Sequence, residues 1–160
     1  MLMKKSWPPL SFTLHSRVFD GRVMVIMKNL LFHLGFATLI THELDAMTQS
    51  EWRLLFILRS LPEEIASFTF VVVHIPLIAA LLWLTNSESP GIQHRSRIAF
   101  AIFLMVHVGL HKLLEHHPDY TFNTLLSLSL IYGGGLLGFL YLIAIAISRL
   151  PYTNPVNQNS

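Results

Sequence analysis

Two stretches of the chain place imidazole and carboxylate side chains close together: His42, Glu43 and Asp45 in the first, and His107, His111 and Glu115 in the second. Residues four positions apart lie on one face of a helix, so the second set can point in one direction. Such groups bind Zn²⁺, Fe²⁺ and Mn²⁺, and they also transfer protons. The chain has no cysteine, which excludes thiolate sites.

These residue types predict a site for a divalent transition metal, Zn, Fe or Mn, that acts on a lipid or another small hydrophobic molecule. The roles are assigned as follows: metal ligands His42, Asp45, His107 and His111, and acid/base groups Glu43 and Glu115. The spacing differs from that of the zincin motif, because Ala46 stands where that motif has its second histidine. The prediction therefore depends on residue types and helix faces.

The composition indicates a membrane protein. Of 160 residues, 52% are hydrophobic and only 12% are charged, whereas about a quarter of the residues in a soluble domain are charged. The formal charge is +2, and the basic residues are scattered instead of forming a stripe. We therefore expect no nucleic-acid partner.

Four apolar stretches are long enough to span a bilayer, which takes about 20 residues. They cover 30–47, 65–84, 98–114 and 125–147. The sequence thus predicts an all-α, polytopic membrane protein with four transmembrane helices in a bundle, formed by residues 27–150. Residues 1–26 form an N-terminal extension, which is not translated if Met27 is the true start, and polar residues 151–160 form a disordered tail.

The distribution of Lys and Arg predicts that both termini are cytoplasmic. Eight lie in the N-terminal stretch, the second loop and the C-terminal flank, and three lie beside the other two loops. In this topology His42 and His111 both lie at the outer ends of their helices. We therefore expect these two histidines to face each other across the bundle.

Two other functions are consistent with the same residues. In the first, the polar cluster has no enzymatic role and serves helix packing, or docks a second copy or another membrane protein. In the second, the protein is a haem b cytochrome with His74 and His107 as axial ligands, because both lie near the middle of their helices.

Two further sequence patterns resemble those of a family of small bacterial integral membrane proteins of unknown function. They are His42-Glu43-Leu44-Asp45-Ala46 followed by Glu51-Trp52-Arg53, and His117-Pro118-Asp119-Tyr120-Thr121-Phe122-Asn123. The chain is also loosely similar to membrane proteins named for a His-x-x-Glu-Glu motif, although the acidic residues of this chain follow His42 at other positions. The resemblance to the family covers about residues 27–147. It implies a multi-pass protein of the bacterial cytoplasmic membrane, and it implies no reaction or cofactor.

Overall fold

The computed structural model describes residues 12–149 of the chain and, from residue 21 onward, their side chains. Within this range the protein is all-α and contains no strand, as predicted. The elements follow in this order: α1 (Phe12–Thr48), the short 3₁₀ turns η1 (Glu51–Arg53) and η2 (Leu58–Ser60), α2 (Glu63–Thr85), α3 (Pro90–Leu114) and α4 (Leu125–Ser148).

Residues that favour helix ends separate the long helices. Pro62 precedes α2 and Pro90 is the first residue of α3, where the missing N–H of proline costs no helical hydrogen bond. Thr124 caps α4, because its hydroxyl accepts a hydrogen bond from the backbone N–H of Ser127 at 3.0 Å. These breaks agree with the predicted ones.

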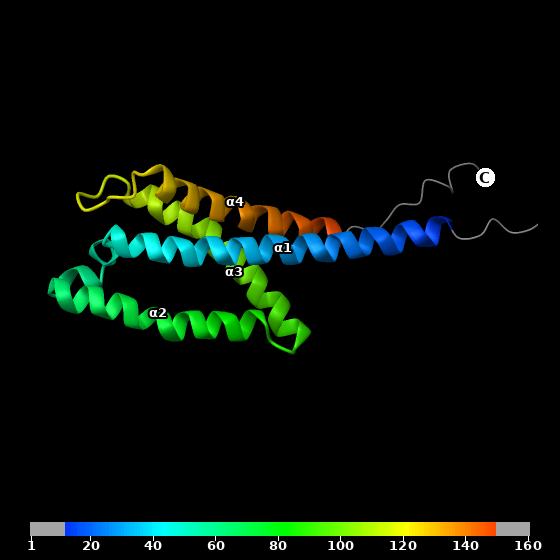
Figure 1. Cartoon of the computed structure of the whole chain (residues 1–160), viewed down its shortest axis with the longest axis horizontal. Helices are drawn as coiled ribbons and strands as arrows, with labels where there is room; N and C mark the ends of the chain where they lie inside the picture. Colours follow the sequence, from blue (N-terminus) through cyan, green and yellow to red (C-terminus); the bar gives the residue numbers. More distant parts are fainter. Residues whose placement is uncertain (1–11, 150–160) are drawn as a thin grey trace, which may run out of the picture.

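Helices α1, α3 and α4 pack closely together, whereas α2 lies beside them as an outer helix (Figure 1). Glycines permit the close approach of α4 to α3. A Cβ atom added to Gly138 would lie 2.5 Å from the carbonyl oxygen of Ala101, and one added to Gly135 would lie 2.4 Å from a methyl group of Val108. The predicted bundle is therefore best described as a three-helix core with one peripheral helix.

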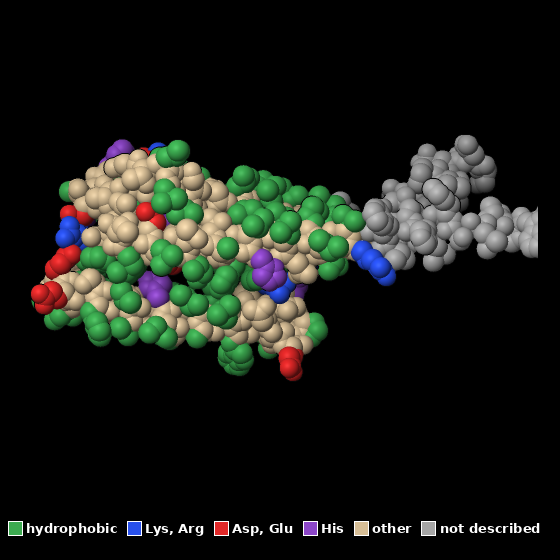
Figure 2. All heavy atoms as spheres, viewed as in Figure 1, with side chains coloured by type: hydrophobic (Ala, Val, Ile, Leu, Met, Phe, Trp, Pro, Cys, Tyr) green, Lys and Arg blue, Asp and Glu red, His purple; other side chains and the backbone are tan. Residues whose placement is uncertain are grey.

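Four helical segments are long and apolar enough to cross a membrane: Gly21–Thr48, Glu63–Thr85, Pro90–Leu114 and Leu125–Ser148. In the view of Figure 2, hydrophobic side chains cover most of the helices, and most charged side chains lie toward their ends. Such a surface suits a hydrocarbon surrounding and is larger than the apolar patches of soluble monomers. The segments contain the predicted spans; the first and third begin nine and eight residues earlier than predicted, and the other two extend by one to three residues.

The first helix is longer than the sequence pattern suggested, because α1 begins at Phe12 and includes much of the expected N-terminal extension. The segment between α1 and α2 does not extend either helix but forms two short 3₁₀ turns. The predicted disordered tail, 151–160, lies outside the described residues. The start of α1 and the end of α4 lie at one end of the molecule, opposite the end of α3 (Figure 1).

Candidate metal centre

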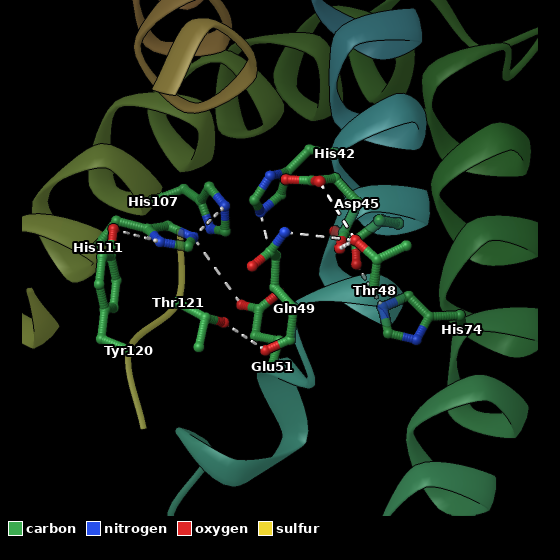
Figure 3. A network of polar contacts seen from close by, with 11 residues as sticks. His42, Asp45, Thr48, Gln49, Glu51, His74, His107, His111, Tyr120 and Thr121 are labelled. Atoms are coloured by element: carbon green, nitrogen blue, oxygen red, sulfur yellow. Dashed lines mark hydrogen bonds and ion pairs between the residues drawn. The ribbon is translucent and has the colours of Figure 1, made fainter. Parts of the chain in front are cut away.

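Three histidines from two helices meet near the end of the molecule where α1 and α3 both end. His42 comes from α1, and His107 and His111 come from successive turns of α3 (Figure 3). On α1 the residues that face the other helices include Phe32, Leu39 and His42, so the helix packing directs the His42 side chain inward. The sequence-based expectation that His42 and His111 face each other agrees with this arrangement.

One nitrogen of each of the three rings lies within 4.8 Å of the others. The Nε2 atoms of His107 and His111 are 3.1 Å apart, and the ring centroid of His42 lies 4.7 Å from that of His107 and 5.1 Å from that of His111. Ligand atoms bound to one tetrahedral zinc ion lie about 3.3 Å apart, given zinc–nitrogen bonds of about 2.0–2.1 Å. A shift of side chains by an ångström or so is therefore enough for all three to bind one ion.

His42 is buried without hydrogen-bond partners. Its exposed fraction is 1%, and neither Nδ1 nor Nε2 has a partner among the described residues. An unsatisfied buried polar group costs about 1–3 kcal/mol, so native proteins rarely keep one without a reason. The cavity beside His42 and His107 measures about 10 Å³, which is room for about one water molecule at most. Both His42 nitrogens are therefore available to a ligand.

Glu51 provides a carboxylate on the open side of the histidines. Its two oxygens lie 3.9 Å from Nε2 of His42 and 3.9 Å from Nε2 of His111. The chain reaches this position because Ser50, with φ 56°, adopts the left-handed conformation and turns the backbone after α1. Burial and the nearby carboxylates of Glu43 and Asp45 raise the pKa of Glu51 to about 8.

The loop after α3 closes the other side of the cluster. Phe122 is fully buried, and its ring packs against those of His42 and His111 at centroid distances of 5.6 and 4.7 Å. The Tyr120 hydroxyl lies 3.3 Å from Nδ1 of His111, so Nε2 is the nitrogen of that ring that faces the other two histidines. Thr121 donates a hydrogen bond to the backbone carbonyl of Gln49 at 2.8 Å, which joins this loop to the turn that carries Glu51.

The remaining predicted ligand, Asp45, lies next to the cluster and outside the group of close nitrogens. It is buried on α1 with an exposed fraction of 7%. One of its carboxylate oxygens lies 3.4 Å from the Thr48 hydroxyl, and the other, Oδ2, has no partner among the described residues. Asp45 therefore lies beside the centre, and its oxygens are not among the ligand atoms that lie within 4.8 Å of one another.

The two predicted acid/base residues have partners elsewhere. Glu43 points toward α2 and pairs with His74 at 2.8 Å. Glu115, at the end of α3, pairs with Lys112 at 2.6 Å, and the hydrogen bond from this lysine lowers the pKa of Glu115. The carboxylate that faces the histidines is instead Glu51, which entered the sequence analysis only through the resemblance.

A cluster of three histidines at the ends of apolar helices defines the class: an all-α protein with four candidate membrane spans and a potential metal site. The family DUF6713, described as a family of unknown function, matches residues 28–148, and the chain belongs to this family. The match covers nearly the same residues as the resemblance. No curated protein and no solved structure matches the chain.

Proposed function

We propose that the chain is an integral membrane protein that binds one divalent transition metal ion through His42, His107 and His111. The observation that carries the proposal is the convergence of three imidazole nitrogens within 4.8 Å, with both nitrogens of the central His42 buried and unsatisfied. Each ring turns one nitrogen toward the point where the three rings meet, and the hydrogen bond between Nε2 of His107 and Nε2 of His111 leaves His42 without a partner among the described residues. One cation that accepts a lone pair from each ring solves this problem.

The donor set favours Zn²⁺, Fe²⁺ or Mn²⁺. Three nitrogens with a nearby carboxylate are borderline ligands of the kind these ions bind. Glu51 is placed to complete the coordination or to act as the acid/base group beside it, since its oxygens lie 3.9 Å from two of the ring nitrogens. The crowding of Glu43, Asp45 and Glu51 also favours a positive charge at this point.

A lipid or another small hydrophobic molecule is the substrate class that the surroundings favour. An apolar groove of about 330 Å³ lies between α1, α2 and α3, and Phe103 and Leu39 are among its lining residues. The Phe103 ring packs against that of His107 with centroids 5.6 Å apart. The groove therefore adjoins the centre from the side that faces the hydrocarbon region.

The experiment that tests the proposal is elemental analysis of the full chain, purified in detergent without a histidine tag and washed with a mild chelator. We expect about one transition metal ion per chain. The variants His42→Ala and His111→Ala should lose it, and His33→Ala is the matched control. His33 lies on the same helix, but its ring contacts the Asn29 carbonyl and the Phe32 ring and not the cluster. Folded protein that is free of metal, with a thermal stability unchanged by chelator, would contradict the proposal.

The haem alternative receives less support from the geometry. Both ring nitrogens of His74 have partners, Nδ1 the carbonyl of Phe70 and Nε2 the carboxylate of Glu43. An axial haem ligand must offer a free lone pair to the iron. The packing alternative predicts that buried polar groups are satisfied, and this is not the case for His42.

A further inference from the structure

A second polar pocket lies at the opposite end of the helices from the histidine cluster. It has a volume of about 210 Å³ and lies between α1, α3 and α4. Its polar lining residues are Lys28, Asn29, Gln93, His94, Arg97, Tyr141, Ser148 and Arg149. Neither Asp nor Glu is among the lining residues, so three cations share one pocket without a carboxylate.

Arg97 is held firmly in the wall of this pocket. Its Nε donates to the carbonyl oxygen of Thr85 at 2.9 Å, and its Nη1 donates to the side-chain oxygen of Asn29 at 2.9 Å. The guanidinium also lies over the ring of Phe32, 4.5 Å from its centroid. These contacts join the middle of α1 and the end of α2 to α3, so Arg97 has a structural role in addition to its charge.

Lys28 and Arg149 form fewer contacts than Arg97, and more of their N–H groups are free to donate hydrogen bonds. The Lys28 ammonium is 3.4 Å from the Ser148 hydroxyl, and Nη2 of Arg149 donates to Nε2 of His94 at 2.8 Å. An arginine has five N–H donors and a lysine has three, so most donors of these two side chains lack a protein acceptor among the described residues. In that part of the chain, neither side chain forms an ion pair with a carboxylate.

We propose that this pocket binds a phosphate-bearing anion. Three cations in one pocket repel one another, and a phosphate oxygen accepts hydrogen bonds from several of them at once. The pocket lies at the end of α4 and about two turns inside the starts of the candidate spans Gly21–Thr48 and Pro90–Leu114, close to the level at which lipid headgroups lie and at which Lys and Arg attract anionic lipids. The phosphate can therefore belong to a lipid headgroup or to a soluble phosphate.

The test uses a double variant that carries both Lys28→Gln and Arg149→Gln. Its matched control is Arg95→Gln. Arg95 is a cation at the same end of α3 that does not line the pocket. Arg97 is left unchanged, because its loss would disturb the helix contacts. Native mass spectrometry of the full chain in micelles doped with phosphatidylglycerol or phosphatidylcholine measures bound lipid, and thermal shift with inorganic phosphate at constant ionic strength measures the soluble source.

We expect the double variant to bind phosphatidylglycerol, or inorganic phosphate, about tenfold more weakly or worse, because it loses the charge-assisted hydrogen bonds of two cations to the anion. Arg95→Gln should bind like the original chain. Preference for phosphatidylglycerol identifies a lipid headgroup, and protection by inorganic phosphate alone identifies a soluble anion. Equal loss in Arg95→Gln, no loss in the double variant, or no preference for an anion over phosphatidylcholine would overturn the proposal. The single variant Lys28→Gln repeats the test if the double variant does not fold.

Discussion

At the scale of single residues, the chemistry of the centre depends on Glu51 as well as on the three histidines. This carboxylate lies 3.9 Å from the Nε2 atoms of His42 and His111, on the side that the rings leave open. Three neutral imidazoles bring no negative charge of their own to a divalent ion. A divalent cation at the proposed site would lower the pKa of Glu51, and the ionised carboxylate would then supply the charge that the ion needs in an apolar surrounding.

We expect Glu51→Gln to weaken metal binding by about 10–100-fold, the range found when residues that support a metal site are replaced. Glu115→Gln is the control. It removes a carboxylate at the same end of the molecule, but this carboxylate pairs with Lys112. Its metal affinity should remain that of the original chain. Competition with a chelator of known affinity measures both variants. Equal affinities for all three proteins would show that Glu51 has no part in the site.

Helix periodicity was sufficient to predict which histidines meet. His107 and His111 are one turn apart, and His42 lies on the packed face of α1. The position of Glu51 could not be predicted, because it depends on the left-handed conformation of Ser50, and serine does not favour this conformation as glycine does. The carboxylate of Glu43 was assigned to the site because a helix pattern does not reveal a partner on another helix, here His74.

At the scale of the helices, the ion pair between Glu43 and His74 is a direct polar contact from α1 to the peripheral α2. Both side chains are largely buried, with exposed fractions of 21% and 18%. Hydropathy could not predict that α2 would lie outside the core, because α2 and α4 are both apolar around their whole circumference. This polar contact therefore adds to the apolar packing of Ala66 and Phe70 that holds α2 in place.

A double-mutant cycle of Glu43→Ala and His74→Ala should give a coupling energy of about 0.5–3 kcal/mol, as expected for residues in direct contact. The free energy of unfolding in mixed detergent micelles provides the measurement. The pair Glu43→Ala and His33→Ala is the control, since His33 contacts Asn29 and not Glu43. If the effects of the two substitutions on the free energy of unfolding are additive in both cycles, the contact between Glu43 and His74 does not stabilise the position of α2.

The contact between α3 and α4 should be sensitive to a single methyl group. Gly138→Ala places a Cβ atom 2.5 Å from the Ala101 carbonyl oxygen, so the helices must move apart at a cost of about 1–3 kcal/mol. Gly133→Ala is the control on the same helix, because nothing lies within 4 Å of its added Cβ atom. We expect a lower melting temperature for the first variant only. Equal melting temperatures for the two variants would show that α3 and α4 are not in close contact at Gly138.

At the scale of the whole molecule, the placement of the centre relative to the two sides of the membrane follows from the helix directions. The ends of α1 and α3 lie together, and the connection between α2 and α3 lies at the opposite end (Figure 1). The Lys and Arg distribution predicts that the centre lies near the outer face. The basic pocket of Lys28, Arg97 and Arg149 then lies near the cytoplasmic face.

Because the chain has no cysteine, single cysteine variants can test this topology. Ser60, in the first connection, and Ser89, in the second, are both exposed. We expect Ser60→Cys to react with a membrane-impermeant maleimide in intact cells, and Ser89→Cys to react only after the cells are permeabilised. The opposite labelling pattern would invert the assignment of the two faces, and labelling of both sites in intact cells would contradict a membrane-spanning arrangement.

The division of the histidines between α1 and α3 sets an order of events during synthesis. A ribosome adds about 5–20 residues per second, so α1 with His42 emerges several seconds before His107 and His111. During this interval the nascent chain has one histidine of the three and cannot hold the ion firmly. For the proposed metal centre, loading therefore comes after the third helix has joined the first, and a chain interrupted before α3 is expected to leave the ribosome without metal.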